Sequence, residues 1–196
     1  MDENKIELAR SVSMKRSYEM RLETERLIIR YFEENDDNDL YEYLSKGEVV
    51  KYEPYEAFTY EQAKEETKRR ETDHNFYAVA LKSGKVIGNL YFAEGEFDTW
   101  EIGYVFNDSY WGQGYATEAV NALLAEAFDK WNVRRVIAMC NPENESSWKL
   151  MERVGMRREG HLKKNVFFFK DENGEPIWQD TYEYGLLREE YENFLR

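Results

Sequence analysis

The chain has 196 residues, of which 42% are hydrophobic, 16% aromatic and 34% charged. This length favours one domain with a substantial core, and the aromatic content argues against a disordered chain. The longest apolar run, residues 76–81, is much shorter than the roughly 20 residues of a transmembrane helix. Residues 1–20 carry charges throughout, which argues against a secretory signal. We therefore expect a cytoplasmic protein without a membrane partner.

The numbers of cysteine, histidine and charged residues exclude several further classes of protein. Cys140 is the single cysteine, which leaves no disulfide and no cysteine-based zinc site, and we expect it to be a buried structural thiol. Two histidines, His74 and His161, are too few for a His-rich metal centre. Lys and Arg total 27 against 40 Asp and Glu, and the net charge of −13 argues against broad nucleic-acid binding.

The first elements that the sequence predicts are a strand and two helices. An apolar stretch at residues 27–32 predicts a short strand. A polar cluster at residues 35–39 can cap a helix that continues to about Lys46. Thr59, with Gln62 three residues later, fits a capping box at the start of a second helix.

Three strands are predicted next. Residues 76–81 and 86–92 are joined by the glycine-containing turn 82–85, which is typical of a hairpin. A second turn, residues 94–98, leads to residues 100–106, where large side chains occupy alternate positions as in a half-buried strand. These residues therefore predict a three-stranded meander.

The strongest helical pattern follows the meander. Eight apolar residues within 116–131 recur at helical spacing on one stripe, which predicts an amphipathic helix packed on a sheet. Residues 135–140 then predict a buried strand and residues 145–154 a shorter helix. Residues 160–170 and 177–187 predict two long strands of a hairpin. The whole pattern is that of one α/β domain.

Residues 107–117 connect the last strand of the meander to this helix. A glycine-containing loop before a helix N-terminus offers unpaired backbone N–H groups and the positive end of the helix dipole, which suit a diphosphate. Gly112 and Gly114 allow the backbone to approach a ligand, although a tight turn alone would also explain them. The loop lacks the lysine of a P-loop, and Thr117 replaces the last glycine of a dinucleotide fingerprint.

The loop resembles a motif of a known family. Residues 111–116 read Trp-Gly-Gln-Gly-Tyr-Ala and resemble motif A of the GNAT superfamily of N-acetyltransferases, Gln/Arg-x-x-Gly-x-Gly/Ala, with Trp in the first position. Residues 144–147, Asn-Glu-Ser-Ser, are similar to the Asn-x-x-Ser that opens the next helix in the ribosomal-protein alanine and serine N-acetyltransferases (the RimJ/RimL-like subgroup). Residues 22–27 and 115–119 also resemble this subgroup.

The resemblance covers residues 22 to about 191, so we expect residues 1–21 to form an N-terminal arm and residues 22–196 a single N-acetyltransferase domain. It implies the GNAT fold, a mixed sheet of about seven strands flanked by helices. It also implies acetyl-CoA as co-substrate, with the pantetheine arm along a strand end and the diphosphate on the loop amides. The residues assigned to the cofactor in this way are Tyr104, Val105, Phe106, Gly112, Gln113, Gly114, Tyr115, Ala116, Thr117 and Asn144.

The resemblance implies catalytic roles as well. Ser147 corresponds to the residue that protonates the leaving thiolate, and Met151 stands where many members have a tyrosine acid. Helix capping is the alternative role for Asn144 and Ser147. The ribosomal serine-type enzymes have a Glu base where this chain has Val166. Glu101 is the nearest alternative base, and a solvated or structural carboxylate is its competing interpretation.

The absence of a glutamate base at position 166 affects which kind of acceptor amine we expect. An α-amino group with a pKa of about 7.7–8.0 is roughly a tenth neutral at pH 7, whereas a lysine amine is neutral only about 0.04% of the time. We therefore expect direct attack by a protein or peptide N-terminal amine in a ternary complex, with water relaying the proton. A backbone N–H near Val105 would polarise the thioester carbonyl.

Charge is unevenly distributed along the chain. Residues 33–73 have a net charge of −8 and would wall the acceptor site in the family, whereas residues 133–170 have a net charge of +5 and would adjoin coenzyme A. These signs suit a cationic amine and a phosphate-rich cofactor, although a solvated surface explains most of the side chains. Four aromatic residues of the acidic segment are candidates for an acceptor pocket or for the core: Tyr52, Tyr55, Phe58 and Tyr60.

Two other functions stay open. One is an acetyltransferase of a small amine, such as a polyamine, an amino acid or an antibiotic. The other is a non-catalytic regulator that binds acyl-CoA, which the missing Glu makes plausible. Similar proteins are commonly dimers, so a homodimer that uses the C-terminal hairpin is a further expectation by analogy.

Overall fold

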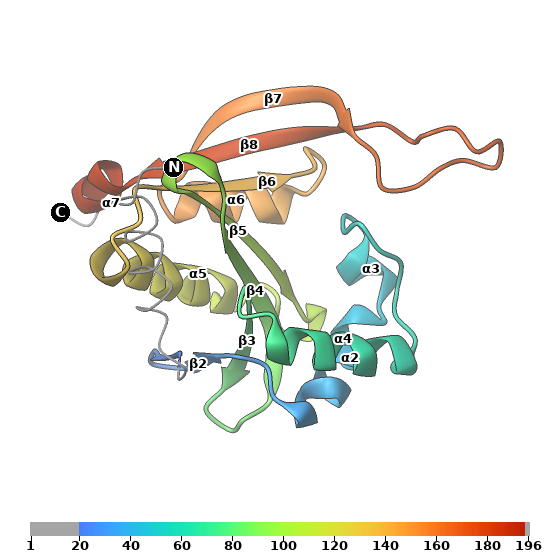
Figure 1. Ribbon diagram of the computed structural model, residues 1–196, viewed down its shortest axis with the longest axis horizontal. Coiled ribbons are helices and arrows are strands. Elements are labelled where there is room, and N and C mark those ends of the chain that lie inside the picture. Colours follow the sequence, from blue (N-terminus) through green and yellow to red (C-terminus); the bar gives the residue numbers. More distant parts are fainter. Residues whose placement is uncertain (1–19, 195–196) are drawn as a thin grey trace, which may run out of the picture.

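Eight strands form one mixed sheet in the computed structural model, which describes residues 20–194 (Figure 1). Neighbouring strands follow the order β1-β2-β3-β4-β5-β6-β8-β7, and all pairs are antiparallel except β5 and β6. The mixed sheet is confirmed, with eight strands in place of about seven. The strands are β1 (Arg21–Glu23), β2 (Leu27–Arg30), β3 (Phe76–Leu81), β4 (Val86–Glu94), β5 (Thr99–Phe106), β6 (Arg135–Cys140), β7 (Arg157–Val166) and β8 (Gln179–Leu187).

Helices flank this sheet, as expected. None in the described part of the chain is long and apolar enough to cross a membrane. Residues 1–19 of the predicted N-terminal arm lie outside the described residues. The helices are α2 (Asp37–Leu44), α3 (Gly47–Val50), α4 (Tyr60–Thr72), α5 (Tyr115–Ala125), α6 (Glu145–Arg153) and α7 (Arg188–Phe194).

Alternate residues of a strand serve two separate cores. Successive side chains of a strand point to opposite faces of the sheet. On β3, Tyr77 and Val79 join the larger core with residues of α5 and α6, whereas Ala78 and Ala80 join the smaller core with residues of α2. β5 divides in the same way, since Trp100 lies in the larger core and Val105 in the smaller one. The sheet is therefore the middle layer between two sets of helices.

Two helical predictions are confirmed in detail. Thr59 and Gln62 form the predicted capping box, in which each side chain accepts a hydrogen bond from the other residue's backbone N–H, at 3.3 and 2.8 Å. The helical stripe at 116–131 corresponds to α5, which begins at Tyr115, and to a π-helical turn at Glu126–Lys130 that continues it.

The strands of the C-terminal hairpin have different bounds from those predicted. The sequence predicted strands over residues 160–170 and 177–187, whereas β7 covers Arg157–Val166 and β8 covers Gln179–Leu187. The pairing of β7 shifts between Leu162 and Val166, where Lys164 has a positive φ of 46°. The Asp180 carboxylate accepts a hydrogen bond from the Lys164 backbone N–H at 2.9 Å, which stabilises this irregular turn.

Candidate active site

Strands β5 and β6 separate halfway along their length. They pair only from Thr99 to Glu101 of β5, after which β5 follows β4 and β6 follows β8 (Figure 1). The backbone N–H of Asn107 donates to Ile87 of β4 at 2.9 Å. Because the direction of backbone hydrogen bonds alternates along a strand, the peptide groups of Tyr104 and Phe106 face the gap between β5 and β6. Val105, between them, faces β4.

The loop after β5 has the backbone that a bound anion needs. Gly112 and Gly114 adopt positive φ angles of 71° and 81°, and Gly114 precedes the first turn of α5. Within residues 20–194, no hydrogen bond satisfies the N–H groups of residues 112–117. A left-handed turn and a helix N-terminus therefore present consecutive unpaired amides, which fit a diphosphate.

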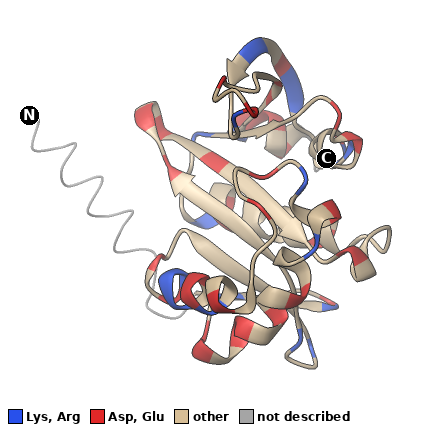
Figure 2. Cartoon of the chain, turned by 90° about the vertical axis from the view of Figure 1, so that its right-hand side faces the viewer, with Lys and Arg blue, Asp and Glu red and all other residues tan. Residues whose placement is uncertain are grey.

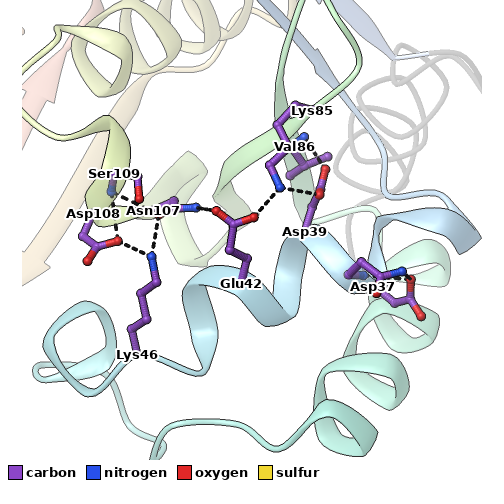
Figure 3. Close-up of polar contacts among 10 residues, drawn as sticks. Asp37, Asp39, Glu42, Lys46, Lys85, Val86, Asn107, Asp108 and Ser109 are labelled. Carbon is purple, nitrogen blue, oxygen red and sulfur yellow. Dashed lines mark hydrogen bonds and ion pairs between the residues drawn. The ribbon is translucent and has the colours of Figure 1, made fainter.

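The start of this loop is anchored by polar contacts to α2 and to Lys46, which follows α2 (Figure 3). Asn107 is fully buried, and its amide Nδ2 donates to Glu42 at 2.8 Å. Its Oδ1 accepts hydrogen bonds from the Ser109 backbone N–H and from Lys46 Nζ, both at 3.1 Å. Lys46 also forms an ion pair with Asp108. These contacts fix the direction in which the chain leaves β5.

A second anchor holds the helical side of the loop. The Arg26 guanidinium donates to the Gln113 carbonyl at 2.9 Å, forms an ion pair with Glu118 at 2.6 Å, and lies over the Tyr115 ring. Burial would raise the pKa of Glu118, but hydrogen bonds from Thr24 and Arg26 outweigh it, so the pKa is lowered. Arg26 therefore neutralises a carboxylate that lies in the first turn of α5.

Trp111, the residue that departs from the family motif, contacts the end of β5. Its indole Nε1 donates to the Phe106 carbonyl at 2.8 Å, while about half of its surface remains exposed. The indole thus occupies one lone pair of a carbonyl that faces the gap. The other lone pair remains for a ligand that follows β5.

Asn144 and Ser147 lie at the start of α6. The Asn144 side chain accepts hydrogen bonds from the Ser147 backbone N–H at 3.2 Å and from the Ser146 hydroxyl at 2.9 Å, so it caps the helix. The Ser147 hydroxyl lies 3.0 Å from the Tyr104 hydroxyl. Ser147 is therefore brought into contact with β5, at the level where β5 has left β6.

Glu101 is the last residue of β5 that pairs with β6, and it lies on the face opposite Trp100. It lines a pocket of about 390 Å³ with Tyr91, Arg135 and Glu183. Burial raises the pKa of its carboxyl. Arg135 is bound to Glu159, so the pocket wall is acidic overall.

The aromatic residues of the acidic segment have different environments. Tyr55 and Phe58 pack against the smaller core, and the exposed Tyr60 donates to Asp37. Tyr52 donates a hydrogen bond to the Glu143 carbonyl at 3.2 Å, which brings the loop after α3 beside the loop before α6. Only Tyr52 among the four thus contacts the α6 side of the gap.

Two titratable side chains, those of Tyr104 and Glu53, were not singled out from the sequence. The first is the phenol of Tyr104, because the sequence gives no sign that its side chain reaches α6. The second is Glu53, whose pKa burial raises to about 7 although Tyr55 and Arg70 lower it. Among the described residues, no cluster of three or more His, Cys, Asp or Glu side chains could hold a metal ion.

Comparison with known proteins identifies the family. The sequence matches the acetyltransferase (GNAT) domain over residues 26–157. It is 40% identical over 176 residues to the uncharacterized N-acetyltransferase YnaD of Bacillus subtilis, covering 88% of this chain and 99% of that protein. The Ribosomal-protein-serine acetyltransferase of Escherichia coli is 32% identical over 91 residues, which are 45% of this chain and 51% of that protein.

A solved structure agrees with these sequence matches. A GNAT-family acetyltransferase from Bacillus anthracis has a TM-score of 0.79 with 37% sequence identity, and the match covers 87% of this chain and 99% of that one. The fold and the ordered sequence motifs lead to the same conclusion. This chain belongs to the GNAT family of acetyltransferases and is an N-acetyltransferase.

Proposed function

We propose that this protein transfers an acetyl group from acetyl-CoA to the N-terminal α-amine of a protein or peptide. The observation that carries the proposal is the gap between β5 and β6, which opens beside the unpaired amides of residues 112–117. The amides suit the diphosphate of the cofactor, and the gap leaves the peptide groups of Tyr104 and Phe106 available to its pantetheine arm. Asn144 would contact this arm beside its helix cap.

The two proposed catalytic residues lie on opposite sides of the sheet. Glu101 belongs to the face of the smaller core, whereas Ser147 contacts Tyr104 on the face of the larger core. The amine would enter from the open, acidic Glu101 side, and the sulfur would leave toward Ser147. The amine nitrogen forms its bond to the acetyl carbon while the carbon–sulfur bond breaks. The proton that the amine loses passes to Glu101 or water, and Ser147 protonates the sulfur, which leaves as a thiol.

Charge stabilisation would come from the backbone. The carbonyl oxygen of the thioester gains negative charge during attack, and an N–H donor aimed at it lowers the barrier. The ladder of β4 and β5 leaves the N–H groups of Tyr104 and Phe106 for this task, since that of Val105 faces β4. Holding amine and thioester together supplies a further part of the acceleration.

A small amine is the second candidate acceptor, and the pocket beside Glu101 favours it. Three further carboxylates line this pocket against one arginine, which Glu159 already neutralises. A compact cation would fit such a wall. The partial match to a Ribosomal-protein-serine acetyltransferase supports the protein acceptor instead.

An acceptor panel tests the proposal. The protein is mixed with acetyl-CoA and with peptides that have free α-amines, peptides that are Nα-blocked but contain lysine, and small amines, and the release of free thiol is followed. Turnover on free α-amines supports the proposal, whereas equal turnover on internal lysines contradicts the terminal-amine preference. Turnover on small amines alone assigns the second acceptor. Tight cofactor binding without turnover on any acceptor would identify a non-catalytic regulator.

A further inference from the structure

Tyr104 presents two different groups to the gap beside β5. Its backbone faces the gap, and its side chain crosses toward α6 with the larger core beneath it. The phenol oxygen lies 3.0 Å from the Ser147 carbonyl and 3.0 Å from the Ser147 hydroxyl. Nothing in the family assignment uses this phenol. Its two contacts fall on the one residue that we propose as proton donor.

A phenol has a single proton, so it can donate to only one of these two oxygens at a time. When it donates to the carbonyl, the Ser147 hydroxyl is free to donate back to the phenol, and the serine proton is then held within the protein. When it donates to the Ser147 hydroxyl, the serine proton must point elsewhere. The Ser147 carbonyl keeps a partner in both cases, because it lies within α6 and accepts the bond of the helix ladder.

The second arrangement makes Ser147 a better donor. A hydroxyl that accepts a hydrogen bond is polarised and donates more strongly. The two hydrogen bonds from the phenol to the serine and from the serine to the sulfur therefore strengthen each other. Negative charge on a sulfur near Ser147 would favour this arrangement. Without the phenol, a helical serine tends to donate to the carbonyl four residues earlier. For Ser147 this carbonyl belongs to Glu143, in the loop before α6, and a bond to it would turn the hydroxyl away from the sulfur.

The surroundings keep the phenol protonated. Burial raises the pKa of Tyr104 well above its usual value, although its hydrogen bond with Ser147 opposes this. The neighbouring Cys140 thiol also contacts Ser147, and burial raises its pKa to about 11. Both groups therefore stay neutral at physiological pH, and neither competes with the sulfur as a negative charge.

We propose that Tyr104 is a positioning residue, whose phenol donates to Ser147 and directs the serine proton at the leaving sulfur. This inference rests on the proposed acetyl transfer. Tyr104 itself does not pass a proton to the substrate. The Ser147 hydroxyl gives its proton to the sulfur as the carbon–sulfur bond breaks, and water returns to Ser147 the proton that the amine has lost.

Paired substitutions test the coupling. Single-turnover acetyl transfer is measured with acetyl-CoA and the best acceptor of the panel at saturation. Ser147→Ala should slow the reaction about a hundredfold, the low end of a general-acid contribution. Tyr104→Phe should slow it about tenfold, as expected for the loss of one orienting hydrogen bond. The double variant should be as slow as Ser147→Ala alone. Tyr104→Phe should cause no further loss of rate there, because the phenol acts only through the serine.

Three controls separate positioning from structure. The dissociation constant for acetyl-CoA and the melting temperature of Tyr104→Phe should stay near the wild-type values. Tyr184→Phe also loses phenol hydrogen bonds, to Arg158 and Glu152, and should keep the wild-type rate because it does not contact Ser147. Tyr104→Leu replaces Tyr104→Phe if the phenylalanine variant does not fold, with the same expected result.

The outcomes are distinguishable. A wild-type protein that acetylates no amine overturns the proposed function, and the inference with it. Wild-type turnover that Tyr104→Phe leaves unchanged overturns the inference alone. Additive losses in the double variant also overturn it, because they would mean that the phenol acts independently of Ser147.

Discussion

Glu53, in the loop after α3, has an unfavourable charge at neutral pH. Burial raises its pKa to about 7, from an ordinary 4.5. Between these two pH values the unfolded chain releases the proton and the folded chain keeps it, so the native state loses stability as pH rises. Glu53→Gln should therefore raise the free energy of unfolding at pH 8 by about 2 kcal/mol more than at pH 5. Urea unfolding at the two pH values measures this difference.

The neighbouring Glu56 provides the matched control, because it is exposed in the same loop. Glu56→Gln should change the unfolding free energy by the same small amount at both pH values. If the wild type and Glu53→Gln follow parallel curves from pH 5 to pH 8, Glu53 does not titrate in this range in the native protein.

The raised pKa of the Glu101 carboxyl leads to a prediction about catalytic activity. Burial raises the pKa of this carboxyl, so a base at this position becomes protonated, and inactive, at a higher pH than an ordinary glutamate. Glu101→Gln should lower kcat by about 10- to 100-fold near neutral pH and should flatten the acid limb of the kcat profile. Steady-state kinetics from pH 5 to pH 9 with saturating peptide measure both effects.

The control for this variant lies at the exposed turn of the C-terminal hairpin. Glu172→Gln removes a carboxylate there and should keep the wild-type profile. A Glu101→Gln protein with an unchanged acid limb would assign the proton to water alone.

At the scale of elements, the turn between β1 and β2 supports the first turn of α5. Arg26 neutralises Glu118 beside the loop amides, so Arg26→Gln leaves an unpaired carboxylate near the proposed diphosphate site. We expect the dissociation constant for acetyl-CoA to rise about five- to tenfold from this repulsion and from the loss of the Gln113 contact. Isothermal titration calorimetry at moderate salt measures it.

The double variant Arg26→Gln/Glu118→Gln isolates the repulsive part. It should recover most of the lost affinity, since it removes the charge that Arg26 had neutralised. Equal affinities of the single and double variants would mean that the Glu118 charge does not reach the cofactor. The melting temperature of the double variant, compared with that of Arg26→Gln, reports whether altering the Thr24–Glu118 contact disturbs the turn.

Local patterns predicted those elements whose causes are local. The capping box at Thr59 and the apolar stripe of α5 each depend on residues three or four apart, and both are confirmed. The hairpin of β7 and β8 depends on a contact across the sheet, between Asp180 and the backbone of Lys164. No pattern within either strand shows this contact, so the sequence predicted two regular strands and missed the irregularity in their pairing at Lys164.

The same distinction applies to the candidate site. The glycine loop at 112–114 is local, and its left-handed backbone and position before α5 follow from the sequence. The contact between Tyr104 and Ser147 joins residues 43 positions apart. The Arg26 and Glu118 pair joins residues 92 apart. Sequence reasoning named Ser147 through a family motif, but it could not assign a partner that only the tertiary fold supplies.

At the scale of the whole molecule, the acidic and the basic residues are concentrated in different segments of the chain. Figure 2 shows acidic residues, in red, on the lower helices, and α2 alone contributes Asp37, Asp39 and Glu42. The segment that carries β6, α6 and β7 is basic by five charges despite the net charge of −13. An anionic cofactor and a cationic acceptor would therefore be attracted to different sides of the gap beside β5.

This division predicts how the acceptor preference depends on salt. Peptides of equal length with a free α-amine, followed by lysines, by neutral residues or by glutamates, should be ranked in that order by kcat/KM. Because ions screen exposed charges over about 10 Å at 0.1 M salt, the advantage of the lysine peptide should shrink steadily toward 0.5 M, while the neutral peptide changes little. An unchanged ranking at high salt would assign the preference to specific side-chain contacts, and a preference for the glutamate peptide would contradict the acidic acceptor wall.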